Sequence, residues 1–196
     1  MVCLNLPPHL RFLPENMYLA GLVPGPHPLT GHKHNHFLDI LVDQLETSFH
    51  PGLFFTKTAS YPLGRRARAA LVGVVSDVVA ARSSTGLGPS TRGDNLCSFC
   101  GISKGAMENF DRTQWPDRDD DAHRKLAEQW RDASTEAERD DIFSRYGIRW
   151  TPFFRLSYWN PRKMVVIDSM HNLLLGVLKR HCLTLWGMND DRPDGD

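Results

Sequence analysis

Near the C-terminal end of the chain, the pattern of apolar positions predicts a buried strand followed at once by a helix. Met164 to Ile167 form a short unbroken apolar run, which is typical of a strand covered on both faces. From Ser169 onward the apolar positions take a helical period, and Gly187 is placed to end the helix. The apolar stripe of this helix comprises Met170, Leu173, Leu174, Val177, Leu178 and Leu185.

Asp168 occupies the junction between this strand and this helix. In open α/β sheets ligands bind at the carboxyl ends of the strands, and a helix N-terminus favours negative charge. The position equally suits an aspartate that only caps the helix. The pattern alone leaves both interpretations open.

A second apolar run, Ala69 to Val75, predicts another central strand, and Asp77 follows it closely. Carboxylates from two strands suit phosphoryl transfer, because divalent metal ions that bridge them clamp the attacking and leaving oxygens. Two such carboxylates repel each other unless a cation lies between them. Since many strands end in aspartate, spacing alone does not identify such a site.

Composition and period divide the rest of the chain. Residues 1–32 are rich in Pro and Gly and are expected to form an extended segment. Residues 33–188 are expected to form the core, with a helical insertion over about 104–160, and residues 189–196 an unstructured tail. The elements predicted in the core are a helix over 37–49, a strand over 52–58, helices over 123–133 and 135–146, and an aromatic segment over 150–159 that packs this helical pair onto the sheet.

Composition is that of an ordinary soluble domain of 196 residues, with 41% hydrophobic and 23% charged residues. The formal net charge is zero, so any affinity for nucleic acid must come from local patches. No apolar run is long enough to span a bilayer and the N-terminus lacks a signal peptide, so an intracellular protein without a membrane partner is expected. The cysteines then indicate reduced thiols or a metal rather than disulfides.

Cys97 and Cys100 have the spacing of a zinc knuckle, in which two thiolates from one turn supply half of a tetrahedral site. Further ligands must come from elsewhere, and Cys182 and His171 are candidates. They lie on one predicted helix about 16 Å apart, so only one of them fits the same ion. A reduced thiol pair without metal is the alternative. The candidates for the fourth ligand are His123 and His181.

A series of segments over about residues 3–188 resembles the transposase proteins of fungal CACTA-type (En/Spm-like) DNA transposons. In chain order these segments are CLNLPPHLRFLPENMYLAGLVPGP, HFLDILVDQL, SDVVAAR, LCSFC, NFDRTQWP, HRKLAEQWRDASTEAERDDIFSRYGIRW, YWNPRKMVVIDSMHNLLLGVLKRHC and WGM. The resemblance implies an α/β fold, a partial RNase H-like core of the DDE class, which cuts and rejoins DNA with Mg²⁺ or Mn²⁺. It also implies the DNA of transposon ends as partner and a nuclear location, with a homo-oligomer left open.

Carried over residue by residue, the resemblance makes Asp77 the first catalytic aspartate and Asp168 the second. Asp168 then belongs to the family's Asp-x-x-His element, which His171 completes. The resemblance also favours His171 as the further zinc ligand. The chain departs from the family at Val78 and Val79, where the family usually has Leu-Pro.

The third acid of the DDE class has no counterpart in a predicted element of this chain. The last glutamate is Glu138. We therefore expect a transposase fragment, truncated before its active site is complete and inactive alone. The alternative is a non-catalytic module, a remnant or a domesticated protein, that binds DNA or a protein and carries a zinc knuckle. The acids that follow Asp168 are Asp190, Asp191, Asp194 and Asp196.

Two groups of basic residues suit contacts with DNA phosphates, each of which adds to a salt-dependent affinity. Arg65, Arg66 and Arg68 precede the second apolar run, and Lys179 and Arg180 lie on the predicted C-terminal helix. A solvated strand start and a solvated helix face explain the same residues equally well.

Overall fold

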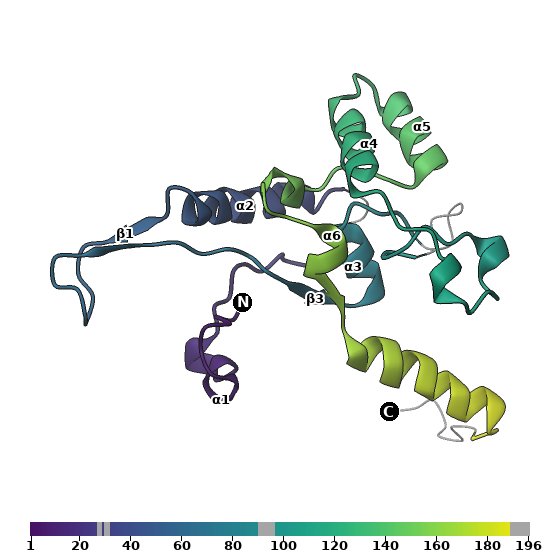
Figure 1. Ribbon diagram of the computed structural model, residues 1–196, viewed down its shortest axis with the longest axis horizontal. Helices are drawn as coiled ribbons and strands as arrows, with labels where there is room; N and C mark the ends of the chain where they lie inside the picture. Colours follow the sequence, from purple (N-terminus) through teal and green to yellow (C-terminus); the bar gives the residue numbers. More distant parts are fainter. Residues whose placement is uncertain (27–28, 30–31, 90–96, 189–196) are drawn as a thin grey trace.

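Two short parallel strands, β3 and β4, lie at the centre of the fold, and each leads directly into a helix (Figure 1). The computed structural model describes residues 1–26, 29, 32–89 and 97–188. In chain order the elements are α1 (Pro8–Arg11), η1 (Pro14–Asn16), α2 (Asn35–Phe49), β1 (Leu53–Phe55), β2 (Arg65–Ala67), β3 (Val74–Ser76), α3 (Val78–Ser84), η2 (Lys104–Ala106), η3 (Arg112–Gln114), α4 (Asp120–Asp132), α5 (Glu136–Tyr146), η4 (Pro152–Arg155), α6 (Pro161–Met164), β4 (Val165–Ile167), η5 (Met170–Leu178) and η6 (His181–Leu185).

The register of the parallel pair brings the two aspartate positions to one edge. Ser76 of β3 lies opposite Ile167 of β4. One residue further on, the Asp168 backbone N–H donates to the Ser76 carbonyl at 2.7 Å, so the ladder continues past the last paired residues. The two predicted strands thus form and pair in parallel, but β3 begins at Val74 rather than at Ala69, and neither strand is covered on both faces, because Val75 and Val166 are exposed.

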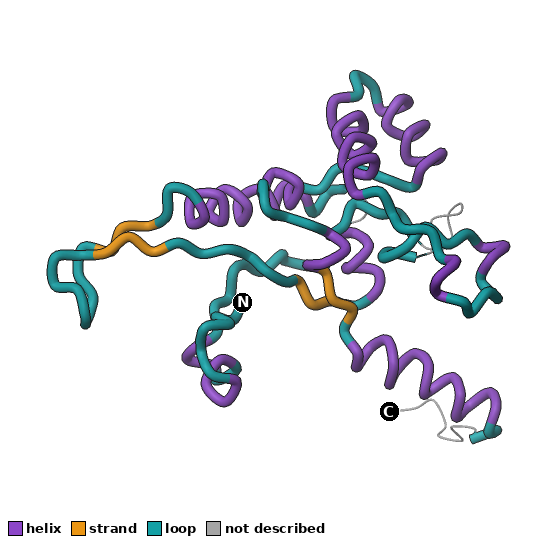
Figure 2. Tube along the Cα trace, viewed as in Figure 1, coloured by secondary structure: helices purple, strands orange, loops and turns teal. Residues whose placement is uncertain are grey.

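The other sheet is a separate antiparallel ribbon of β1 and β2 (Figure 2). Leu53 lies opposite Ala67, and Phe55 opposite Arg65. The strand predicted over 52–58 is therefore shorter, and its side chains are exposed. Within the described ranges the fold is mixed, with helices around two two-stranded sheets, and an RNase H-like architecture stays a prediction.

The hydrophobic core lies where the aromatic segment around η4 meets α2, α4 and β4. Phe153 stacks on Trp159 with 4.8 Å between ring centroids, and Phe154 packs edge-on against His123 of α4. The segment therefore joins the α4–α5 pair to the strands, as its aromatic pattern predicts. The buried residues of this core are Val42, Leu45, Ala81, Leu87, Ala127, Ile148, Phe153, Phe154, Leu156, Trp159 and Val165.

Arg155 attaches η4 to α2 through charge. Its guanidinium donates to the carboxylates of Asp39, Asp43 and Glu46, at 3.1, 2.5 and 2.6 Å. The bond to Asp43, then that to Glu46, raises the pKa of Arg155, so its charge is retained. The three acids share one face of α2 because they are three or four residues apart. This face is thereby held against the segment that leads into β4.

Helix α5 begins and ends where the sequence predicts. The Thr135 hydroxyl accepts the Glu138 backbone N–H at 3.2 Å, and the Glu138 carboxylate accepts the Thr135 N–H at 3.3 Å. This reciprocal pair is a capping box. Gly147 ends the helix at φ 63°, a left-handed conformation that glycine adopts without steric cost.

The helix after Asp168 forms as predicted, but its apolar stripe is exposed. The backbone is helical from 169 to 185, with wide turns in η5 and η6, and it leads away from the β3–β4 pair (Figure 1). Leu173 and Val177 are 54% and 61% exposed, so no described segment covers this face. No helix in the described part of the chain is long and apolar enough to cross a membrane.

Candidate active site

Asp77 is the first residue after β3 and caps α3. Its Oδ1 accepts the Ala80 backbone N–H at 2.8 Å, and the side chain is exposed to solvent. This cap fixes where the carboxylate lies relative to the strand end. Capping uses one of the lone pairs of the carboxylate, so the group retains capacity for another ligand.

Asp168 occupies the matching position after β4 and binds its own helix. Its Oδ1 accepts the Met170 backbone N–H at 3.0 Å, and its Oδ2 contacts His171 Nδ1 at 2.5 Å. The hydrogen bond from His171, followed by that from Met170, lowers the pKa of Asp168. Asp168 is therefore ionised in neutral solution. Of the two interpretations that the sequence leaves open, the helix cap is observed, and ligand binding at the strand end stays a prediction.

The two carboxylates alone do not form a metal site in which every ligand comes from the protein. No group of three or more His, Cys, Asp or Glu side chains gathers in a metal-binding arrangement among the residues that the structure describes. Mg²⁺ commonly keeps several waters and is held by one or two carboxylates together with substrate phosphates. Asp77 and Asp168, one from each strand end, would be the carboxylates of such a site, and magnesium binding stays a prediction.

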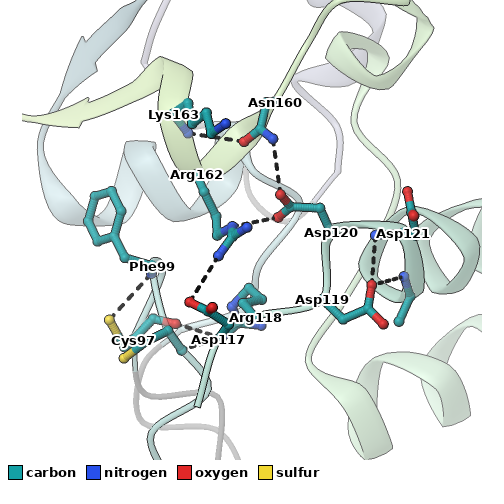
Figure 3. A network of polar contacts seen from close by, with 12 residues as sticks. Cys97, Phe99, Asp117, Arg118, Asp119, Asp120, Asp121, Asn160, Arg162 and Lys163 are labelled. Atoms are coloured by element: carbon teal, nitrogen blue, oxygen red, sulfur yellow. Dashed lines mark hydrogen bonds and ion pairs between the residues drawn. The ribbon is translucent and has the colours of Figure 1, made fainter. Parts of the chain in front are cut away.

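The turn that carries Cys97 and Cys100 is tied to the start of β4 by a polar network (Figure 3). Arg118 Nη2 donates to the Cys97 carbonyl at 2.6 Å, and Cys100 forms a bridge with Asp117. Arg162 of α6 then contacts Asp117 at 3.6 Å. Since α6 runs directly into β4, this network connects the cysteine turn to the strand that ends in Asp168.

Asp120 completes the same network from the first turn of α4 (Figure 3). Its Oδ2 accepts from Asn160 Nδ2 at 3.0 Å, and its Oδ1 lies 2.9 Å from Arg162 Nε. The second contact is an ion pair whose angle falls outside that of a hydrogen bond. The charged residues around the start of α4 thus have a structural role. The sequence shows only that this stretch is polar and acidic.

The two thiols interact with each other, and their pKa values shift in opposite directions. Burial opposes ionisation of Cys97, but the Phe99 and Cys100 N–H groups, the Cys100 thiol and the Arg118 charge together lower its pKa. Burial and the neighbouring Cys97 raise the pKa of Cys100. One sulfur is therefore a better metal ligand or nucleophile than the other.

The zinc ligands predicted to join the cysteines do not do so within the described ranges. His171 contacts Asp168, His181 packs against Trp186, and the buried His123 packs against Phe154. A structural zinc ion needs four ligands, and the thiol pair supplies two. The described residues alone do not fit zinc, and zinc binding stays a prediction.

The predicted DNA-contacting residues fall on two different elements. Arg65 and Arg66 belong to β2, and Arg68 follows it, all exposed. Lys179 and Arg180 lie between η5 and η6 on the exposed C-terminal helix. Both groups face solvent.

Comparison of the chain with protein-family models, with curated proteins and with solved structures finds no match.

Proposed function

We propose that Asp77 and Asp168 form a divalent-metal site for DNA strand cleavage and transfer, as part of a DDE-class transposase. The observation that supports this proposal is the parallel pairing of β3 and β4, each of which runs directly into an aspartate. Because the two strands run in parallel, both end at the same edge of the sheet, and the aspartates that follow them lie at that edge. This is the edge at which α/β proteins bind their ligands.

Each residue has a defined part in this proposal. Asp77 and Asp168 would hold Mg²⁺ or Mn²⁺, and the ion would supply Lewis-acid activation of the phosphate and of the attacking oxygen. His171 keeps Asp168 ionised and oriented through its 2.5 Å contact. The α3 cap holds Asp77 in place.

Metal binding without cleavage is the behaviour we propose for this chain alone. A DDE site needs a third acid to fix the geometry of in-line attack, and no glutamate follows Glu138. The aspartates at 190, 191, 194 and 196 lie outside the described residues. Misplacement of reacting groups by about 1 Å already costs about a hundredfold in rate.

Calorimetric titration with Mn²⁺ and a nicking assay on a labelled DNA duplex test the proposal together. We expect weak Mn²⁺ binding that is lost in Asp77→Asn and in Asp168→Asn, with no nicking by any form. Asp140→Asn removes an exposed carboxylate from α5 and is the matched control, which retains metal binding. Equal Mn²⁺ binding by wild type and both variants would refute the metal site.

Nicking would contradict the expectation that the active site lacks an acid. Metal-dependent cleavage by the wild-type chain that disappears in Asp77→Asn would show a complete active site. In that case the chain is an active enzyme by itself. The non-catalytic alternative, a DNA- or protein-binding module with a zinc knuckle, predicts instead zinc in metal analysis of chelator-free protein and no effect of either aspartate.

A further inference from the structure

The β1–β2 ribbon and its connecting turn, residues 53–68, form an arm that leads away from the core beyond the end of α2 (Figure 1). Every residue of both strands is exposed. Phe54 and Phe55 are 56% and 49% exposed. Neighbouring exposed aromatic side chains are typical of a surface that binds a partner. We name these residues the basic arm.

The basic arm is shaped by its own contacts. Thr58 and Tyr61 exchange backbone hydrogen bonds at 3.1 and 3.3 Å across the tip. Gly64 has φ 87°, and a Cβ there would lie 2.7 Å from the Phe54 ring. Only glycine therefore allows the turn to close onto the aromatic side chain. The arm is a built ribbon rather than an irregular loop.

The strand register distributes the same chemistry to both faces of the ribbon. Phe54 lies opposite Arg66, and Phe55 lies opposite Arg65. Successive side chains of a strand point to opposite faces, so each face carries one phenylalanine beside one arginine. A ribbon with one face on a core would not repeat the pair in this way.

The charge of the basic arm is positive, and among the residues that the structure describes no acidic side chain forms an ion pair with it. Lys57, Arg65, Arg66 and Arg68 are its charged residues, and no Asp or Glu occurs between Glu46 and Asp77. The arginines of β2 instead meet a ring and backbone carbonyls: Arg65 lies over the Tyr61 ring at 4.6 Å, and Arg66 donates to Gly52 at 3.0 Å. Their positive charge therefore remains available to an anionic partner.

We infer that the basic arm binds duplex DNA, with the ribbon in the major groove and its arginines on the phosphates. The major groove of B-DNA admits a two-stranded β-ribbon, whereas that of duplex RNA is too deep and narrow. Arginine contacts with phosphates supply affinity on either side of the groove. The basic arm would hold the DNA for the proposed function. Only the choice of DNA as the ligand rests on that proposed function.

Fluorescence anisotropy of a short labelled DNA duplex, measured in EDTA from about 50 to 200 mM salt, tests the arm. The triple variant Arg65→Gln, Arg66→Gln, Arg68→Gln is expected to bind at least about tenfold more weakly at the low-salt end. The slope of log K against log salt is expected to fall by about 0.9 for each arginine that contacts a phosphate. The corresponding triple lysine variant preserves the charge and is expected to retain most of the affinity.

One further control separates the arm from the rest of the molecule. Arg145→Gln removes an exposed arginine from α5, where it pairs with Asp141, and is expected to leave binding unchanged. Because EDTA excludes the metal, the anisotropy measurement reports on the arm, whereas the Mn²⁺ titration reports on the two aspartates.

Three results would overturn the inference. Equal affinity and equal salt slope for wild type and the triple glutamine variant would show that the arm does not contact DNA. Tighter binding of an RNA duplex than of the DNA duplex would exclude the major-groove geometry. Absence of DNA binding by the wild type at low salt, with an intact far-UV circular dichroism spectrum, would leave the arm as a protein-docking surface instead.

Discussion

The contact between His171 and Asp168 sets the charge of the candidate site. The hydrogen bond from His171 is the main cause of the lowered pKa of Asp168, with the Met170 backbone N–H second. A group with a depressed pKa contributes stability above its unfolded pKa and loses it as pH falls through the folded value. The ionised carboxylate is thus part of the folded state before any metal arrives.

Replacing His171 with alanine is expected to raise the pKa of Asp168 towards its ordinary value. A ¹³C NMR titration of the aspartate carboxyls in metal-free buffer measures this change directly. His181→Ala is the control on the same helix, because His181 packs on Trp186 and not on Asp168. An unchanged Asp168 titration in His171→Ala would show that the backbone alone holds the carboxylate.

His123 is a buried imidazole, and neither of its ring nitrogens has a hydrogen-bond partner among the described residues. Burial, and secondly the Arg118 charge, lowers the pKa of His123 from 6.5 to about 4. The Thr85 backbone lies near the ring and opposes this slightly, but outside hydrogen-bond geometry. The ring is therefore neutral in the folded protein and packs as an aromatic against Phe154.

Stability is expected to fall as the pH drops from about 6.5 to about 4, because only the unfolded state takes up the His123 proton there. The slope is at most about 1.4 kcal/mol per pH unit from this group. Urea unfolding at several pH values measures it. His123→Leu is expected to flatten this part of the curve, whereas removal of the exposed His36 leaves it in place.

Helix ends carry the most readable local signals in this chain. The spacing of Thr135 and Glu138 predicts a capping box, and both of its hydrogen bonds form. Caps act through neighbouring residues alone, so they need no knowledge of the rest of the fold. The same locality explains why Gly147 ends α5 where expected.

Replacing Thr135 with alanine is expected to cost about 1 kcal/mol of folding free energy. For a chain of this size the corresponding fall in Tm is about 2–4 °C. Thermal unfolding followed by circular dichroism checks the value. Ser134→Ala removes a hydroxyl one residue earlier that does not cap the helix. Its folding free energy is expected to stay within about 0.5 kcal/mol of wild type.

Other elements depend on contacts that a sequence pattern does not contain. The sequence does not predict helix α3, because this helix is short and owes its start to the Asp77 cap beside a paired strand. The apolar period after Asp168 predicts a helix and a face to be covered, but a period does not say by what. Likewise the Cys97–Cys100 spacing brings two thiols together, whereas the position of His171 is set by Asp168.

The aromatic segment around η4 determines where the stability of the molecule resides. Leu156 is 1% exposed among residues from α2, α4 and β4, whereas Leu63 at the end of the basic arm is 93% exposed. Burial of apolar surface contributes roughly 25 cal/mol per Å², so the two leucines differ in energetic weight. Apolar burial in the core therefore contributes most of the folding free energy, and Leu63 in the arm contributes little.

Leu156→Ala is expected to destabilise the protein by about 2–5 kcal/mol, because it leaves a cavity in the core. Leu63→Ala makes the same chemical change in solvent and is expected to stay within about 0.5 kcal/mol. Denaturant unfolding of the two variants beside wild type measures both. A comparable loss for Leu63→Ala would mean that the arm packs on the core in solution.

The parallel pairing of β3 with β4 has a consequence for the order of folding. The two strands are separated by the whole stretch from Asp77 to Met164, so their pairing closes a long loop of chain. The entropy of that closure is recovered only after the intervening helices and aromatic residues have packed. The two strand ends therefore meet late, so the proposed metal affinity would report on whether the chain between them has folded.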